Sequence, residues 1–300
     1  MTQNSPHLKS LTSGDLVGLV SPAAPVKPEQ VEEGLKTLTQ LGFRYRLAEH
    51  AFSDFGLTSA PVEKRLADIY QFLTDPEVRA IWALRGGYGS IQLLQAMDYQ
   101  LWRTHPRWFV GFSDLTAFQW ALYRQTGLPS LSGFTLTSQL HSANPHLTAG
   151  MEILSGERRE IKATDLAEPI RIVREGRETG ALVGGTLSMI GSLCGTPFWL
   201  EEGDWIVFIE DINEPLYRID RYFQQLKLCG FWKKVRGVIL GRFFYEGHPL
   251  SVSPLLLPLL PQGIPVVEDF PYGHYKDSFP LPMGVRAVLD TAPFCLSWEL

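Results

Sequence analysis

The sequence predicts an α/β protein built around a mostly parallel sheet, with a second block of strands and helices after it. In the first 133 of the 300 residues, short apolar runs alternate with amphipathic segments, a pattern typical of βαβ units. A charged stretch of weak periodicity follows, and a second apolar block opens at Gly180. We therefore predict an N-terminal α/β domain at 1–145, a boundary region at 146–178 and a C-terminal β/α domain at 179–300.

Apolar runs that stop at polar or glycine residues predict the strands, and amphipathic segments between them predict the helices. In the first block, strands are expected at 16–20, 44–48, 79–84, 108–112 and 128–133. Helices are expected there at 28–41, 62–73, 91–102 and 115–127. The second block predicts strands at 205–209, 235–240 and 265–267, a helix at 219–228 and a closing hairpin at 286–298.

The composition is that of a globular protein, with 45% hydrophobic and 20% charged residues. A net charge of −5 gives no basic surface for nucleic acid or for an anionic membrane. The chain has no apolar run of about 18 residues, and its polar start, MTQNSPHLKSLTSGD, lacks the apolar core of a signal peptide. Cys194, Cys229 and Cys295 are widely spaced and are expected to be reduced core thiols. These features predict a cytoplasmic protein.

Ser113 lies at the junction between the expected strand 108–112 and the helix that follows it. A serine at such a turn projects from the carboxyl edge of the sheet, with its hydroxyl over the free N–H groups of the helix. This is the geometry of a nucleophile elbow, although Leu115 replaces the second glycine of the G-x-S-x-G motif. The alternative is that Ser113 caps the helix and Asp114 complements its dipole, and this stretch alone favours that alternative.

Three other polar groups follow expected strands at their carboxyl ends, where open α/β sheets bind ligands. They are Arg85-Gly86-Gly87, the pair Glu210-Asp211, and His274. The run RGGYG either brings amides close to a ligand or forms a tight turn, and it lacks the G-x-G-x-x-G and P-loop signatures. His274 is the only histidine at the carboxyl end of an expected strand, although a loop histidine is more often simply solvated.

Glu210 and Asp211 end the apolar run WIVFIED. Either acid is suited to orient a histidine, and strand alternation places the two on opposite faces without showing which one faces the site. Arg218 and Arg221 follow closely, so an ordinary ion pair is the structural alternative.

A serine, a histidine and an acid at three strand ends provide the groups for nucleophilic acyl transfer. The histidine would accept the Ser113 proton, the acid would fix the imidazole tautomer, and backbone amides would stabilise the oxyanion. No H-E-x-x-H motif and no paired Cys or His residues indicate a metal site, so no cofactor is expected. A cysteine nucleophile is disfavoured, because none of the cysteines lies at a strand-to-helix turn.

Six short motifs, in order along the chain, resemble the LD-carboxypeptidase family of serine peptidases, which includes the microcin-immunity peptidases. They are GDLVGLVSPAAP, ALRGGYGS, FVGFSD, GALVGGTLSMIGSLCGTP, FIEDINEPLYRIDR and FPYGHYKDSFPLPMG. The resemblance implies a flavodoxin-like or glutamine-amidotransferase-like N-terminal domain and a swivelling β/α C-terminal domain, with the active site in the cleft between them. It also implies a homodimer.

The resemblance assigns roles to particular residues. It makes Ser113, the serine of GFSD, the nucleophile; Glu210, the first acid of IEDI, the orienting acid; and His274, the histidine of YGH, the base. It also implies that the backbone amides of Gly87 and Asp114 form the oxyanion hole.

Substrate binding is expected to involve Arg85 and Gly86, with Arg218 or Arg221 as alternatives for the substrate carboxylate. The implied reaction removes the terminal D-alanine of murein tetrapeptide by cutting its amide to an L-centre of diaminopimelate, without a metal. The expected partner is therefore a muropeptide, and neither nucleic acid nor a membrane is expected. Two alternatives stay open: a peptidase of the immunity type that cuts a peptide–nucleotide conjugate, and a non-catalytic muropeptide-binding protein.

Three positions depart from the family pattern. Thr186 follows the paired glycines where the family commonly has Asn, and Ser278 stands four residues after the histidine, where Asn is also frequent. The expected strand after the central helix ends in Ser132-Gly133-Phe134 in place of HGP. None of these residues belongs to the triad. We expect them to line the cleft, so they leave the exact substrate open.

Overall fold

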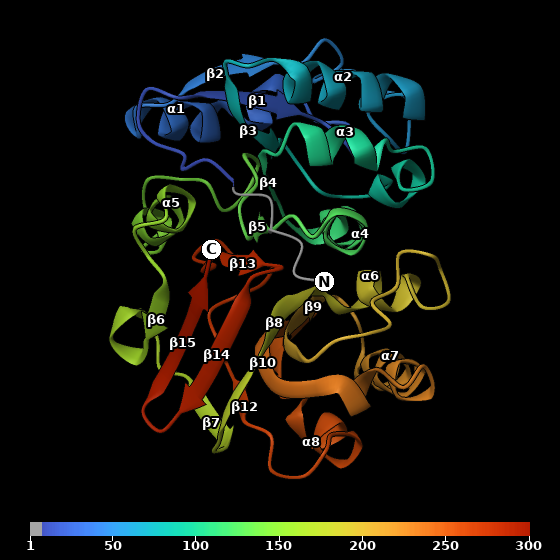
Figure 1. Cartoon of the computed structure of the whole chain (residues 1–300), viewed down its shortest axis with the longest axis vertical. Helices are drawn as coiled ribbons and strands as arrows, with labels where there is room; N and C mark the ends of the chain where they lie inside the picture. The colour runs from blue at the N-terminus through green and yellow to red at the C-terminus, as the bar shows by residue number, and fades with distance from the viewer. Residues whose placement is uncertain (1–7) are drawn as a thin grey trace.

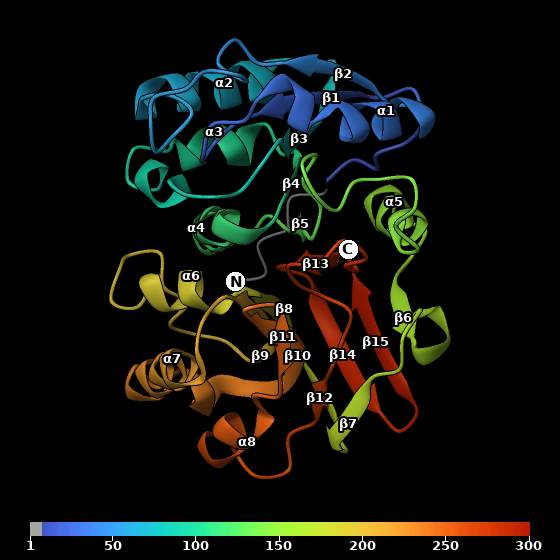
Figure 2. The same cartoon turned by 180° about the vertical axis from the view of Figure 1, so that it is seen from behind.

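The computed structural model describes residues 8–300, which form two β-sheets surrounded by helices (Figure 1; seen from behind in Figure 2). The parallel sheet of the N-terminal half lies above the larger sheet of the C-terminal half in both views. The predicted α/β class, with a parallel N-terminal sheet and a second β/α domain, is confirmed. Residues 1–7, on which the expectation of no signal peptide partly rests, lie outside the described residues.

The first sheet has six strands in the order β13-β5-β4-β3-β1-β2. Strands β1 to β5 run parallel, whereas β13 is antiparallel to β5. Every residue of β1 and β4 is buried, as expected for central strands of a parallel sheet. The strands are β1 (Leu16–Val20), β2 (Arg44–Leu47), β3 (Val78–Ala83), β4 (Trp108–Gly111), β5 (Ser130–Ser132) and β13 (Leu281–Met283).

Up to residue 126 the helices agree with the predicted segments except at 91–102, and the sequence pattern does not predict the helix at 147–155. The segment 91–102 is a short 3-10 turn, η2 (Ser90–Leu93), followed by a separate helix, because the Asp98 carboxylate accepts a hydrogen bond from the Leu101 amide at 3.0 Å and starts a new N-terminus. The helices are α1 (Glu32–Gln40), α2 (Val62–Thr74), α3 (Tyr99–Thr104), α4 (Thr116–Thr126) and α5 (Leu147–Ser155), with 3-10 turns η1 (Pro28–Gln30) and η3 (Ser113–Leu115) before α1 and α4.

The second sheet has nine strands in the order β6-β15-β14-β8-β9-β10-β12-β7, with β11 paired to β10. Its centre, β8-β9-β10-β12, is parallel, and the closing hairpin is confirmed as β14 and β15. The strands are β6 (Glu160–Lys162), β7 (Arg171–Arg174), β8 (Arg177–Thr186), β9 (Trp205–Ile212), β10 (Val235–Tyr245), β11 (His248–Leu250), β12 (Val266–Glu268), β14 (Arg286–Thr291) and β15 (Phe294–Glu299). The helical elements are η4 (Ala163–Asp165), α6 (Leu187–Ser192), α7 (Leu216–Leu228), η5 (Phe231–Lys234), α8 (Ser253–Leu256) and η6 (Leu257–Leu259).

Strand β9 is longer than the sequence predicts. It continues through the two acids to Ile212, because pairing with β10 resumes after an irregularity, with Phe243 opposite Asp211 and Phe244 opposite Ile212. The prediction that the strand ends at residue 209 is therefore wrong. The acids belong to a paired strand, which holds their backbone more firmly than a loop would.

The chain crosses between the two sheets three times: after β5, before β13 and after β13. The segment 146–178, predicted as a boundary, carries α5 and also β6 and β7, the two outermost strands of the second sheet. In the other direction, β13 from the C-terminal part of the chain joins the first sheet beside β5, where the two lie side by side in the middle of the molecule (Figure 1). The halves therefore share hydrogen-bonded strands, while the exact domain limits stay a prediction.

Two further expectations concern membrane-spanning segments and the cysteines. Among residues 8–300, no helix has both the length and the apolar character needed to cross a membrane. All three cysteines are free thiols, but the expectation that they lie in the core is wrong, because Cys229 is exposed and Cys194 and Cys295 are only half-buried.

The two halves are also in close contact where α4 meets the end of β8. The Trp120 indole donates a hydrogen bond to the Gly184 carbonyl at 2.8 Å, one helical turn after Thr116. Gly185 has a φ of +131°, and a Cβ added there would lie 2.4 Å from the Thr116 Oγ1 atom. Only glycine allows this contact, which places the start of α4 against the second sheet.

Gly185→Ala is expected to lower the free energy of unfolding by about 2–4 kcal/mol, since overpacking adds to the strain of a positive φ. Gly195→Ala is the matched control, because Gly195 also has a positive φ (+79°) but has open space around its Cβ position. Comparing the urea unfolding of the two variants separates the cost of overpacking against Thr116 from the cost of a positive φ. Equal destabilisation by the two substitutions would show that the contact with α4 contributes nothing.

Candidate active site

Ser113 occupies a strained turn between β4 and α4. Its φ of +67° lies in the left-handed region, which costs a residue with a Cβ roughly 1–2 kcal/mol. The N-cap positions of η3 and α4 are Phe112 and Leu115, and within residues 8–300 the one hydrogen bond of the Ser113 Oγ atom is to Nε2 of His274, at 2.8 Å. The interpretation of Ser113 as a helix cap is therefore wrong, and the residue has the strand-turn-helix geometry of an elbow.

His274 reaches Ser113 from the other half of the molecule. It lies in the loop between β12 and β13, and its Nδ1 atom is 2.7 Å from the Glu210 Oε2 atom. Glu210, on β9, is completely buried, and the same oxygen also accepts a hydrogen bond from the His274 amide at 3.2 Å. A carboxylate at Nδ1 favours the tautomer with the proton on that nitrogen, which leaves Nε2 free to accept the Ser113 proton.

The electrostatics of His274 suit a base. Burial acts to lower the pKa of His274, but the negative charge of Glu210 and its hydrogen bond outweigh that effect and raise the pKa above its ordinary value. The side chains of Ser113 and His274 are both half-buried, so the reacting atoms are accessible while Glu210 is shielded.

Asp211, the acid next to Glu210, accepts hydrogen bonds from backbone amides. The Asp211 carboxylate accepts hydrogen bonds from the backbone amides of Ser188, at 2.7 Å, and Ile212, at 2.8 Å. Burial, followed by the nearby charge of Glu210, raises the pKa of Asp211 to about 7. Asp211 thus holds the first turn of α6, while Glu210 faces the histidine.

The glycine-rich loop after β3 packs directly against the elbow. A Cβ on Gly86 would lie 2.9 Å from the Ser113 Cβ atom, and Gly87 has a φ of +95°. The Asp114 carboxylate accepts hydrogen bonds from the amides of Gly89, at 3.3 Å, and Ser90, at 2.8 Å, which ties the loop to the elbow. Within residues 8–300 the amides of Gly87 and Asp114 donate no hydrogen bond, so both are free to donate to a ligand.

The three arginines considered for substrate binding differ in their surroundings. The Arg85 guanidinium donates to the Pro25 carbonyl at 3.2 Å and belongs to the glycine-rich loop itself. Arg218 is exposed and forms an ion pair with Glu214 at 2.9 Å. Arg221 lies over the Tyr217 ring at 5.5 Å. Of the three, only Arg85 lies on the loop that contacts the elbow.

The departures from the family pattern lie beneath the triad, so the expectation that they line the cleft is wrong. Thr186 donates from its hydroxyl to the Glu210 Oε1 atom at 2.7 Å. Ser278 accepts from the Gly273 amide at 3.0 Å, next to His274, and Ser132 bonds the Tyr272 hydroxyl at 2.8 Å. All three side chains are buried. These positions are unusual in the sequence, but no local pattern indicates that they support Glu210 and the loop of His274.

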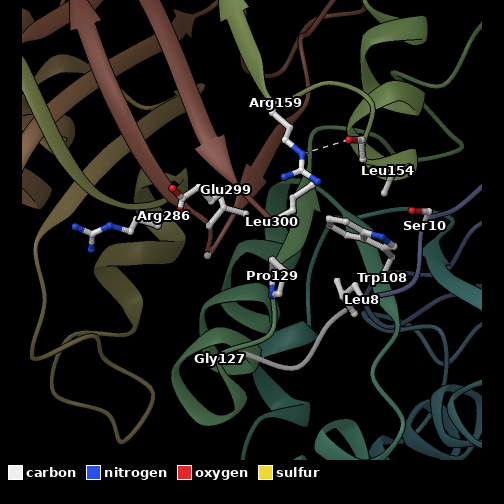
Figure 3. A pocket seen from close by; sticks show the side chains of 13 residues that line it. Leu8, Ser10, Trp108, Gly127, Pro129, Leu154, Arg159, Arg286, Glu299 and Leu300 are labelled. Carbon is white, nitrogen blue, oxygen red and sulfur yellow. Dashed lines mark hydrogen bonds between the residues drawn. The ribbon is translucent and has the colours of Figure 1, made fainter. Parts of the chain in front are cut away.

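A cavity of about 540 Å³ lies elsewhere in the fold (Figure 3). Its lining includes Trp108 and Pro129, which lie at the amino ends of β4 and β5, opposite the elbow, together with Arg159 and Leu300. No triad residue lines it. In the part of the chain from residue 8 onward, no group of three or more His, Cys, Asp or Glu side chains is arranged to hold a metal ion.

Comparison with known proteins gives matches over nearly the whole chain. Residues 17–133 match the model of the LD-carboxypeptidase N-terminal domain, and residues 179–289 match that of the C-terminal domain. The chain is 32% identical over 292 residues to a probable murein peptide carboxypeptidase of Bacillus subtilis, covering 95% of this chain and 91% of that protein. It is 30% identical over 287 residues to the murein tetrapeptide carboxypeptidase of Pseudomonas aeruginosa, covering 91% and 92%.

Among solved structures, the fold is similar to that of the microcin C7 self-immunity protein MccF in complex with aspartyl sulfamoyl adenosine. The TM-score is 0.87 with 23% identity, over 98% of each chain. At this identity the likeness concerns the fold alone, whereas the two domain matches and the carboxypeptidase relatives concern the sequence itself. This chain belongs to the LD-carboxypeptidase family and is a serine-type carboxypeptidase.

Proposed function

We propose that this enzyme hydrolyses the amide between the L-centre of meso-diaminopimelate and the terminal D-alanine of murein tetrapeptide. The observation that carries the proposal is the continuous hydrogen-bonded chain from Ser113 through His274 to buried Glu210, assembled from both halves of the fold. The relatives named for murein peptide and murein tetrapeptide support the substrate class.

In the first half of the proposed reaction, Ser113 Oγ attacks the carbonyl carbon of diaminopimelate and His274 Nε2 takes the hydroxyl proton. The carbonyl oxygen becomes an oxyanion, which the free amides of Gly87 and Asp114 stabilise from the elbow and the adjoining loop. Glu210 stabilises the imidazolium that forms and keeps its orientation. The C–N bond then breaks, and the same proton passes from His274 to the amine of the departing D-alanine.

In the second half, water attacks the acyl ester on Ser113. His274 takes a proton from the water and returns it to Ser113 Oγ as the ester bond breaks. The products are free D-alanine and the tripeptide.

Arg85 is the proposed contact for the carboxylate of D-alanine, with Gly86 beside it. A carboxypeptidase must recognise a free carboxylate, and arginine offers two parallel donors for that group. Arg85 belongs to the loop that carries the Gly87 amide, and within residues 8–300 its guanidinium makes one hydrogen bond, to the Pro25 carbonyl. Action in the cytoplasm and assembly as a homodimer are part of the same proposal; the homodimer rests on the family resemblance.

The test compares initial rates on murein tetrapeptide, on the same peptide ending in L-alanine, and on an aspartyl sulfamoyl nucleoside. The proposal predicts release of D-alanine from the tetrapeptide at a rate far above that on the other two. Faster cleavage of the nucleoside conjugate would move the assignment to the immunity class. Tight binding of the tetrapeptide without turnover would instead indicate a muropeptide-binding protein.

A further inference from the structure

We propose that Thr186 and Thr116 are positioning residues for the acid Glu210, an inference that rests on the proposed function of the triad. Thr186 donates its hydroxyl to Glu210 Oε1 at 2.7 Å, and its backbone amide donates to Thr116 Oγ1 at 3.1 Å. Thr116 lies three residues after Ser113, at the start of α4. Hydrogen bonds therefore lead from Ser113 through His274, Glu210 and Thr186 to Thr116, so the path begins and ends at the turn between β4 and α4.

The two oxygens of Glu210 have separate partners. Oε2 accepts both hydrogen bonds from His274, whereas the hydroxyl of Thr186 is the only partner of Oε1 within residues 8–300. A completely buried carboxylate oxygen without a donor is costly, and the terminal torsion of a glutamate is soft. The Thr186 hydroxyl thus satisfies the charge and also fixes the plane in which Glu210 meets the imidazole.

Thr186 is itself held from two sides. Before it, Gly185 packs against Thr116 so closely that no Cβ fits. After it, the Ser188 amide is bound by the Asp211 carboxylate at 2.7 Å. The two adjacent acids of β9 therefore hold the turn between β8 and α6 at two points. Glu210 accepts a hydrogen bond from the Thr186 side chain, and Asp211 accepts one from the Ser188 backbone amide.

The path also joins the halves of the molecule. Thr116 and the nucleophile belong to the first half, and Thr186, Glu210 and His274 belong to the second. In Figure 1, α4 and α6 lie one above the other where the two halves meet, and α4 contacts both β8 and α6. The orientation of Glu210 is thereby coupled to the packing of α4 against the second half of the molecule.

The experiment uses the full chain with Thr186→Val, which removes the hydroxyl and keeps the amide, and Thr186→Ser, which keeps both groups. Thr116→Val and the double variant complete a mutant cycle, and Thr37→Val, at a buried threonine of α1, is the control for losing a hydroxyl. Each variant is assayed for kcat and KM of D-alanine release. The low-field proton NMR signal of the His274 Nδ1–H group is recorded without substrate.

Thr186→Val is expected to lower kcat by about 10–100-fold, with KM nearly unchanged. This is the range typical for losing a residue that hydrogen-bonds and orients a metal ligand, and Thr186 orients Glu210 in the same way. Thr186→Ser is expected to keep the wild-type kcat. Adding Thr116→Val to Thr186→Val should lower kcat little further, because both substitutions interrupt the same hydrogen-bonded path. The His274 proton signal shifts or broadens in Thr186→Val and stays unchanged in Thr37→Val.

Two results would overturn the positioning role: wild-type kcat with an unchanged His274 signal in Thr186→Val, or a serine variant as impaired as the valine variant. The NMR signal keeps this test separate from the assignment of the substrate. If the wild-type enzyme leaves the tetrapeptide uncut, the proposed function fails, but a signal that shifts in Thr186→Val and not in Thr37→Val still supports the hydrogen-bonded path.

Discussion

Ser113→Ala is expected to lower kcat/KM by about 10⁴–10⁶-fold, the loss typical when the nucleophile of a serine triad is removed. The remaining catalysis over water, about 10³–10⁴-fold, would come from the oxyanion amides and from substrate binding. The variant should still bind the peptide, because the amides of Gly87 and Asp114 are backbone groups and are retained. The measurement is the initial rate at high enzyme concentration, together with peptide binding by calorimetry.

The stability of Ser113→Ala separates chemistry from folding. Ser113 is half-buried, and its hydroxyl has one hydrogen-bond partner among residues 8–300, so the free energy of unfolding should change by no more than about 1 kcal/mol. The loss of activity would then belong to the missing Oγ atom. A variant that folds normally and keeps more than a tenth of the wild-type rate would show that another group attacks the substrate.

Glu210→Gln is expected to lower kcat by about 10⁴-fold, because an amide favours the wrong tautomer of the imidazole and does not stabilise its positive charge. Asp211→Asn is the matched control: the adjacent acid faces the amide of Ser188, and an Asn side chain offers an oxygen for the same hydrogen bond. Its kcat should stay within about tenfold of the wild type. Equal losses in the two variants would contradict the assignment of Glu210 as the orienting acid.

The pH dependence of Glu210→Gln provides a second readout. In the wild type, Glu210 raises the pKa of His274, so kcat/KM should rise with pH along a limb above 6.5, the ordinary histidine value. The substitution removes the charge, and burial then dominates, so the limb should move to lower pH. Because the pKa of His274 is raised in the folded protein, its contribution to stability is complete below pH 6.5 and is lost as the pH rises through the folded value. Glu210→Gln should abolish this decrease in stability.

Local pattern predicts the nucleophile turn but not the choice of the acid. The apolar run before Ser113 and the glycine after α4 mark the ends of a strand and a helix, and both are observed. Strand alternation separates Glu210 from Asp211 without assigning either to the site. That assignment depends on the pairing of β9 with β10, which sets the face that each acid presents and is a non-local property.

Other differences have particular physical causes. The helix predicted at 91–102 is interrupted because Asp98 caps a new helix, a signal that the sequence did contain. Strand β13 is a three-residue segment containing a proline, and it is defined only by its pairing with β5, about 150 residues away in the chain, far beyond what periodicity detects. The contribution of Thr186 likewise depends on a partner, Glu210, that is 24 residues away in the chain and on the adjacent strand.

The most direct test of the account is the time course of D-alanine release from L-Ala-γ-D-Glu-meso-diaminopimelate-D-Ala by wild-type protein, with Ser113→Ala measured in parallel. We expect one D-alanine for each tetrapeptide consumed by the wild type, and release by the variant that is slower by several orders of magnitude. An intact tetrapeptide after incubation with the wild type, or equal release by the two proteins, would contradict it.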